Sequence, residues 1–179
     1  METRIIKIDV ENIRKTAIKI GAIKVKQENQ INNIYDFEDR HLLSNKGYAR
    51  IRVVEDLLNN KNIVFMTVKK LLSNDKYKVM DEKETIISDA EMGKAIFEAL
   101  GLKLVESIKK YRESYKYKDT LIEIDINDKN FCPFPYIEIE SSNEKEIEEV
   151  VNLLGYTMKD TTSKTIYEIL QNETGIKGL

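Results

Sequence analysis

The sequence contains a single cysteine, Cys132, and a single histidine, His41, and these two shortages exclude several common kinds of site. One cysteine cannot form a disulfide framework or a zinc cluster, and one histidine cannot form a paired-histidine metal site. We expect Cys132 to be a small apolar filler and His41 to lie in a surface loop rather than in a Ser-His-Asp triad. The Gly-x-x-x-x-Gly-Lys-Ser/Thr pattern is also missing, which excludes a P-loop enzyme.

Long apolar segments and an excess of basic charge are missing as well. No apolar run approaches the ~18 residues of a membrane span, and the N-terminal stretch METRIIKID carries charges where a signal peptide needs apolar residues. The formal net charge of −2 differs from the basic excess of general nucleic-acid-binding proteins. The sequence therefore predicts a cytoplasmic protein that binds neither membranes nor nucleic acid, and it leaves a homodimer open.

The residues that are present suffice for one compact core. The chain has 179 residues, of which 41% are hydrophobic, and no change of composition suggests a second domain. We therefore predict a single domain over residues 1–179.

Three amphipathic helices are predicted by capping residues at their starts and glycines at their ends. The first follows Asp9, the second begins with the capping box at Ser88, and the third begins at Ser141. A fourth helix is predicted from about Thr162 to Gly175. The predicted apolar faces of the first three are Ile13, Ala17 and Ile20; Met92, Ala95, Ile96 and Ala99; and Ile147, Val150, Val151 and Leu154.

Between the helices the hydrophobic pattern has a period of two, which is typical of strands. About eight long antiparallel strands tend to close into a barrel that can hold one small ligand. The sequence thus predicts an α+β fold, a closed antiparallel β-barrel of about eight strands covered by amphipathic helices. The predicted strands are 2–8, 23–36, 47–55, 61–70, 76–87, 102–117, 119–127 and 134–140.

Charged residues alternate with apolar residues on several of these strands, so that each strand has one charged face. The clear cases are the segments GYARIRV, LIEIDI and PYIEIES, and the same pattern is noisier in MTVKK, MDEKETI and KKYRESY. Solvation of an outer face would explain any one of them. The amphipathic helices favour the other interpretation, because they need the apolar face of the sheet to pack on, which places the charged face inside the barrel.

A charged lumen is costly unless its charges neutralise one another or bind a ligand. Converging arginine and lysine side chains suit a polyanion, and facing carboxylates suit Mg²⁺ or Mn²⁺. A polyanion together with a divalent metal indicates a phosphorylated substrate, most simply a triphosphate. Phosphoryl transfer needs mainly positioning and charge neutralisation, so no covalent nucleophile is required.

The motifs, in this order and spacing, resemble those of the CYTH family, whose members form the triphosphate tunnel fold. The segments carrying the resemblance are Arg-x-Arg in YARIRV, Thr-x-Lys in MTVK, Glu-x-Glu in DEKE, Lys-x-Arg in KYR, Glu-x-Asp in EID, Glu-x-Glu in PYIEIE, and the closing helix in TSKTIYEIL. They span nearly the whole chain. The resemblance implies Mg²⁺ or Mn²⁺ as cofactor and ATP, thiamine triphosphate or inorganic triphosphate as the bound small molecule.

The resemblance also implies a role for each motif residue. Glu138 and Glu140 would be the catalytic carboxylates and, with Glu2, the metal ligands. Acidic residues without an assigned role would line the tunnel, namely Glu82, Glu84, Glu123 and Asp125. The phosphate chain would be bound by Arg50, Arg52, Lys69, Lys110, Arg112 and Lys164, with Arg4 as a further candidate.

The first strand departs from the family pattern. The family carries Glu-x-Glu-x-Lys there, whereas the in-phase residues of this chain are Glu2, Arg4 and Ile6. Three functions stay open as a result: a divalent-metal-dependent triphosphatase, a class IV adenylate cyclase that makes cyclic AMP from ATP, and a tunnel that binds a polyphosphate or nucleotide without turnover.

Overall fold

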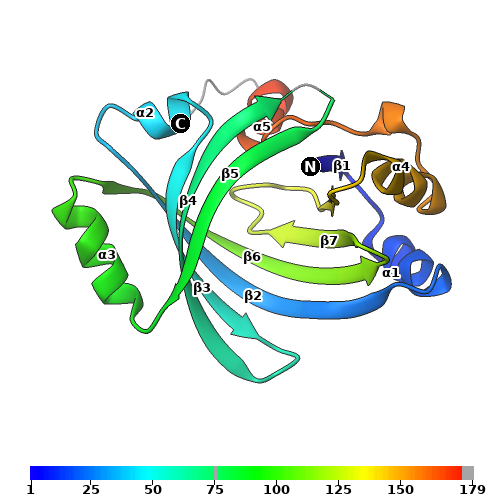
Figure 1. The fold of residues 1–179 in the computed structure, drawn as a ribbon, viewed down its shortest axis with the longest axis horizontal. Coiled ribbons are helices and arrows are strands. Elements are labelled where there is room, and N and C mark those ends of the chain that lie inside the picture. The colour runs from blue at the N-terminus through cyan, green and yellow to red at the C-terminus, as the bar shows by residue number, and fades with distance from the viewer. Residues whose placement is uncertain (75, 175–179) are drawn as a thin grey trace.

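The computed structural model describes residues 1–74 and 76–174, and within them the chain forms a closed antiparallel barrel (Figure 1). Its strands are β1 (Glu2–Ile6), β2 (Ile23–Asp36), β3 (Tyr48–Asp56), β4 (Lys61–Asn74), β5 (Lys78–Ile87), β6 (Lys103–Tyr117), β7 (Thr120–Asn127) and β8 (Tyr136–Glu140). They are hydrogen-bonded in the order β1-β5-β4-β3-β2-β6-β7-β8. The α+β barrel predicted from the sequence is confirmed, and most strand ends lie within two residues of the prediction.

Helices cover the outside and one end of the barrel. They are α1 (Val10–Lys19), α2 (His41–Ser44), α3 (Ala90–Ala99), α4 (Glu144–Leu153) and α5 (Ile166–Thr174), with a 3₁₀ turn η1 (Met158–Asp160). Figure 1 shows α1 and α4 on one side of the barrel and α3 on the opposite side. The end predicted for the last helix, Gly175, lies outside the described residues. No helix within the described part is long and apolar enough to cross a bilayer.

The apolar face of the sheet points outward, as the helix argument predicted. Ile122 and Ile124 of β7 and Ile139 of β8 are fully buried and share one cluster with Ile13 of α1 and Ile147 of α4. Because successive side chains of a strand point to opposite faces, the residues between these isoleucines point into the barrel. Packing on the outside therefore fixes which residues form the lumen.

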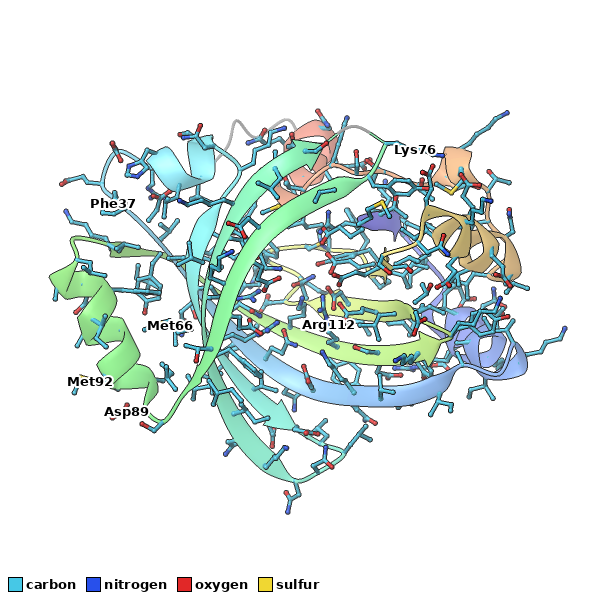
Figure 2. All side chains as sticks on the ribbon, in the orientation of Figure 1. Phe37, Met66, Lys76, Asp89, Met92 and Arg112 are labelled. Carbon is cyan, nitrogen blue, oxygen red and sulfur yellow. The ribbon has the colours of Figure 1, made fainter. Side chains whose placement is uncertain are left out.

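The apolar face predicted for α3 was wrong. Gly93 and Phe97 are buried, whereas the predicted residues are exposed, namely Met92, Ala95, Ile96 and Ala99. Figure 2 shows Met92 on the side of α3 away from the barrel. A Cβ atom at Gly93 would lie 2.4 Å from Cδ1 of Ile87, so the helix packs closely on side chains of the sheet at this position.

Three local predictions also need correction. The helix caps are Asp89 and Asn143 rather than the serines predicted at 88 and 141, because their side-chain oxygens accept hydrogen bonds from backbone N–H groups of the first turn. His41 begins the short helix α2 instead of lying in a loop, although its side chain is exposed and stacks on the ring of Phe37. Cys132 is buried, as predicted.

Candidate functional site

The barrel encloses a cavity of about 480 Å³, a size typical of small-molecule sites. Inward-facing residues of the strands form its walls, and residues of α2 and α5 cover one end. Figure 2 shows Arg112 in the interior of the barrel, among side chains from several strands. The charged face predicted for the lumen is therefore the face that lines this cavity.

Basic side chains dominate the lining, although the whole chain has a net charge of −2. Among the described residues, three acidic side chains line the cavity, Glu2, Glu138 and Glu168. Nine basic side chains line it, namely Arg4, Arg40, Lys46, Arg50, Arg52, Lys69, Lys78, Lys110 and Arg112. The site therefore combines a small volume with many basic side chains, most of which pair with carboxylates of neighbouring strands.

The first basic group lies on β3 and β4, where the sheet register places it beside the glutamates of β5. Arg52 Nη2 donates to Glu84 Oε2 at 2.9 Å, and Arg50 Nη2 lies 3.3 Å from the same oxygen. Thr67, opposite both Arg50 and Glu84, donates to that oxygen at 2.7 Å. One carboxylate oxygen is thus shared by three donors, and it holds both guanidinium groups against the wall of the cavity.

The second basic group lies on β6 and is paired with β7 and β8. Arg112 forms a bidentate pair with Asp125, with Nε–Oδ1 and Nη2–Oδ2 both at 2.6 Å, and its Nη2 also lies 2.9 Å from Glu138 Oε2. Its Nη1 pairs with Glu123 as well. Lys110 Nζ donates to Asp125 Oδ2 at 2.9 Å. Asp125 and Glu123 therefore orient these cations, as Glu84 orients the arginines of β3.

The third basic group surrounds the altered first strand. Arg4 Nε donates to Glu138 Oε1 at 2.8 Å, and Arg4 Nη2 donates to Glu2 Oε1 at 2.6 Å. Lys78 Nζ donates to the same oxygen of Glu2 at 2.8 Å. The remaining nitrogen of the guanidinium, Nη1, donates to the carbonyl oxygen of Lys164 at 2.8 Å. Arg4 therefore bridges the two strands of the predicted metal site.

The pKa shifts indicate a positive potential beside Arg52, Lys110 and Tyr48, whereas the pKa values of Arg4, Lys69 and Arg112, which have carboxylates beside them, are raised. Burial lowers the pKa of Arg52, and the neighbouring charge of Arg50 lowers it further; burial and Arg112 likewise lower the pKa of Lys110. Burial alone would raise the pKa of Tyr48, but Arg50, Lys69 and Lys78 outweigh it and lower that pKa. A bound anion would relieve the repulsion that these shifts express.

Several buried polar atoms on the lumen face have no hydrogen-bond partner within the protein. Among the described residues they include Nε of Arg50, Nε of Arg52 and Nδ2 of Asn127. An unpaired buried donor costs about 1–3 kcal/mol, so such groups normally have a partner. These donors belong to residues that line a basic cavity, although the nitrogen atoms themselves are buried in its wall.

The predicted metal ligands do not assemble into a metal site. Glu2 accepts from Arg4 and Lys78, and Glu138 accepts from Arg4 and Arg112. Only Glu140 of the three forms no ion pair with any described residue, and it is not part of the cavity lining. Within the described part of the chain, no three carboxylate, histidine or cysteine side chains are placed to hold a metal ion. The donor set therefore does not fit a resident divalent cation.

Three further predicted residues lie at different distances from the lumen: Glu82 is close to it, Glu140 is not part of its lining, and the side chain of Lys164 is exposed. Glu82 pairs with Lys69 at 2.8 Å, close to the first basic group. Burial and the carboxylates of Glu123 and Glu2 raise the pKa of Glu140. The side chain of Lys164 is exposed, and its contribution to the lumen is the carbonyl oxygen that accepts from Arg4.

Lys78, Tyr48, Arg40 and Lys46 are among the cavity-lining residues that the sequence did not predict. Lys78 lies in phase with Glu82 and Glu84 on β5, so the period-two pattern could have found it if extended backwards. Tyr48 precedes Arg50 by two residues and could have been found in the same way. Arg40 and Lys46 flank the short helix α2, and no periodicity of the sequence indicates that this segment covers the barrel end.

Comparison with models of known protein families shows to which family the chain belongs. The model of the CYTH domain matches residues 1–166, which is most of the chain. The chain belongs to the CYTH domain family. No curated protein matches the sequence of this CYTH domain.

Solved structures share the fold at low sequence identity. The PH1012 protein of Pyrococcus horikoshii is 24% identical, with a TM-score of 0.72, and the match covers 94% of this chain and 98% of that one. A putative adenylate cyclase of Vibrio parahaemolyticus is 15% identical, with a TM-score of 0.72 and coverage of 96% and 97%. HpAC1 of Hippeastrum is 14% identical, with a TM-score of 0.68 and coverage of 98% of this chain and 96% of that one. It is a putative adenylyl cyclase for which a dominant triphosphatase activity is described. At these identities the likeness concerns the fold.

Proposed function

We propose that this CYTH domain binds a triphosphate-containing small molecule in the lumen of its barrel. Inorganic triphosphate, ATP and thiamine triphosphate are the candidates. The observation that carries the proposal is the group of basic side chains from several strands, Arg50 and Arg52 among them, that lines one cavity. Arginine suits this role because its planar fork donates two hydrogen bonds to a phosphate group at once.

The reaction that we propose is hydrolysis of the terminal phosphoanhydride bond. Water attacks the terminal phosphorus, the bond to the bridging oxygen breaks, and the products are orthophosphate, the shortened phosphate chain and a proton released to solvent. Arg50, Arg52, Lys69, Lys110 and Arg112 would orient the chain and neutralise the charge on the leaving group. The predicted metal has no role in this step, because Glu2 and Glu138 are already paired with basic side chains.

A second candidate, binding without turnover, is favoured by those same ion pairs. Glu138 was the predicted catalytic carboxylate that lines the cavity, yet both of its oxygens accept from guanidinium groups. Burial opposes its ionisation, but Arg4 and Arg112 hold the pKa of Glu138 well below its usual value. A carboxylate held in this way is a poor general base.

Turnover measurements separate these candidates and the class IV adenylate cyclase. Orthophosphate release from inorganic triphosphate, ATP and thiamine triphosphate is measured with Mg²⁺, with Mn²⁺ and with EDTA, and cyclic AMP is measured in the ATP arms. Orthophosphate from triphosphate without cyclic AMP would support the triphosphatase. Cyclic AMP formation would favour the cyclase, and binding with no product in any arm would favour the non-catalytic tunnel.

A variant of the cavity shows whether any turnover comes from this site. Lys110→Gln removes one cation that contacts Asp125 while Arg112 still pairs with that carboxylate, so the fold should be retained. Activity that survives unchanged in Lys110→Gln would contradict the assignment to the lumen. Lys118→Gln is the control, since Lys118 is exposed and pairs with Glu149 on the outside of the barrel.

A further inference from the structure

The guanidinium group of Arg4 occupies the space between two carboxylates that the sequence suggested as metal ligands. It reaches Glu138 Oε1 with Nε at 2.8 Å and Glu2 Oε1 with Nη2 at 2.6 Å. Nη2 also lies 2.6 Å from Glu138 Oε1, so one nitrogen contacts both carboxylates. A cation bridging two acidic side chains over such distances is the arrangement that a divalent metal would otherwise create.

The backbone on both sides fixes the position of Arg4. The register of β1 with β8 places Arg4 directly opposite Glu138. On its other side, the backbone N–H of Arg4 donates to the carbonyl of Thr162, and the N–H of Thr162 donates to the carbonyl of Arg4, both at 2.9 Å. Nη1 is held by the carbonyl of Lys164, and the residue is only 5% exposed. The guanidinium is therefore held in place from three directions.

The two carboxylates have no charge left for a second cation. Glu2 also accepts from Lys78, and Glu138 also accepts from Arg112. Arg4, Lys78 and Arg112 thus contact these two carboxylates, and Arg112 also pairs with Asp125 and Glu123. A divalent ion placed between Glu2 and Glu138 would have to displace Arg4 and would meet the repulsion of Lys78 and Arg112.

We propose that Arg4 is a built-in cation that takes the place of a divalent metal between Glu2 and Glu138, so that the lumen binds triphosphate without a metal ion. The statement about triphosphate rests on the proposed function. The statement about the metal does not, because it concerns the free protein alone.

The first experiment therefore uses Mn²⁺ without any phosphate compound. Binding is measured from the loss of the free Mn²⁺ paramagnetic resonance signal, and the melting temperature is recorded with and without Mn²⁺. We expect no saturable binding by the wild type and none by the control Arg14→Ala, which removes an arginine that pairs with Glu113 on the outside of the barrel. Arg4→Ala should gain one Mn²⁺ site and a higher melting temperature in Mn²⁺, and Glu138→Gln added to Arg4→Ala should abolish both gains.

Two results of this experiment would overturn the proposal. One is a wild type that binds Mn²⁺ through Glu2 or Glu138, as shown by loss of binding in Glu138→Gln. The other is an Arg4→Ala protein that folds but gains no Mn²⁺ site. Arg4→Ala leaves two buried carboxylates with fewer partners, so it is refolded with Mn²⁺ present, which is then removed. Arg4→Gln, which keeps a hydrogen-bond donor beside both carboxylates, decides the question if the alanine variant does not fold.

The second experiment separates failure of this proposal from failure of the proposed function. Inorganic triphosphate is titrated into the wild type by calorimetry, once with EDTA and once with Mg²⁺. Affinities that agree within about threefold support the built-in cation, whereas binding that appears only with Mg²⁺ overturns it. Absence of binding in both arms refutes the proposed triphosphate site and leaves the Mn²⁺ result of the first experiment to stand alone.

Discussion

Arg52 is the residue whose environment is most clearly built for a ligand. It keeps one ion pair, to Glu84, while its Nε is unpartnered and its pKa is lowered by burial and by Arg50. We predict that Arg52→Ala weakens triphosphate binding about tenfold to a hundredfold, since a hydrogen bond to a charged group contributes about 1.5–3 kcal/mol and 1.4 kcal/mol is tenfold. Its free energy of unfolding should change by less than about 1 kcal/mol, or rise, because repulsion inside the lumen is relieved.

Arg14→Ala is the matched control for Arg52→Ala. Arg14 donates from Nε and Nη2 to the carboxylate of Glu113, which is almost fully buried outside the lumen. Loss of these bonds should lower the free energy of unfolding by about 1–3 kcal/mol and leave the affinity for triphosphate unchanged. Urea denaturation and calorimetric titration of both variants give the comparison. An Arg52→Ala protein that loses stability as Arg14→Ala does, yet keeps its affinity, would make Arg52 a structural residue.

We expect triphosphate binding to depend on pH through Lys110. Its pKa in the folded protein lies below the ordinary value of 10.5, because of burial and then of Arg112. In the range between the lowered pKa and 10.5 the unfolded chain binds more protons than the folded one, so the contribution of Lys110 to stability rises with pH there. A bound polyanion would raise the pKa again, and we therefore predict that affinity falls and proton uptake on binding grows as pH rises through this range.

Calorimetric titrations in two alkaline buffers with different protonation enthalpies measure that proton uptake. Lys110→Gln should abolish the difference between the buffers. Proton uptake that is the same in wild type and variant would mean that Lys110 does not face the bound phosphates.

At the scale of elements, the turn between α2 and β3 positions the basic wall of the lumen. A Cβ atom at Gly47 would lie 2.5 Å from the carbonyl oxygen of Lys69, which is backbone and cannot move aside cheaply. We predict that Gly47→Ala pushes β4 away from β3, lowers the free energy of unfolding by about 1–3 kcal/mol and also weakens triphosphate binding, because Lys69 is displaced.

Gly21→Ala is the control for Gly47→Ala, because it replaces a glycine at a position where a Cβ atom makes no close contact. Gly21 has a positive φ of 86°, but a Cβ there meets no atom within 4 Å. The variant should lose about 1 kcal/mol of stability through backbone strain and keep its affinity. If both glycine variants keep their affinity, the close contact at Gly47 does not position the site.

The helices and strands were largely predictable because each has a clear hydrophobic period. The contacts that each element makes with other parts of the chain were not predictable in this way. The pattern of α3 contains two apolar faces, and the helix packs on the sheet through the smaller one, which holds Gly93 and Phe97. Likewise, alternation along β1 predicts that Glu2 and Arg4 share a face. The bond from Arg4 to the carbonyl of Lys164 joins residues 160 positions apart, and no local pattern encodes it.

At the scale of the whole molecule, the residues that line the cavity are mostly basic although the chain as a whole is slightly acidic. The chain has a net charge of −2, yet nine basic and three acidic side chains among the described residues line the cavity. The sequence allowed the charged face to be assigned to the lumen, because the isoleucine face must meet the helices. The balance of charge inside could not be read in the same way, since it depends on which carboxylates point into the cavity and which, like Glu140, lie outside its lining.

A basic cavity that forms only in the folded protein predicts that a bound polyanion stabilises the fold. A ligand that binds only the folded state at a hundredfold excess over its dissociation constant stabilises it by about 2.7 kcal/mol, which for a domain of this size raises the melting temperature by ~5–10 °C. Triphosphate should produce this shift, and orthophosphate at equal concentration should produce much less. Equal shifts with both anions would indicate a general salt effect.

Calorimetric titration of inorganic triphosphate into the wild type and into the double variant Arg50→Gln/Arg52→Gln tests the central claim most directly. We predict saturable binding of one triphosphate per chain to the wild type, and binding at least a hundredfold weaker to a double variant whose melting temperature without ligand is not lowered. Absence of binding to the wild type, or equal affinity of the two proteins, would contradict a triphosphate site in the lumen.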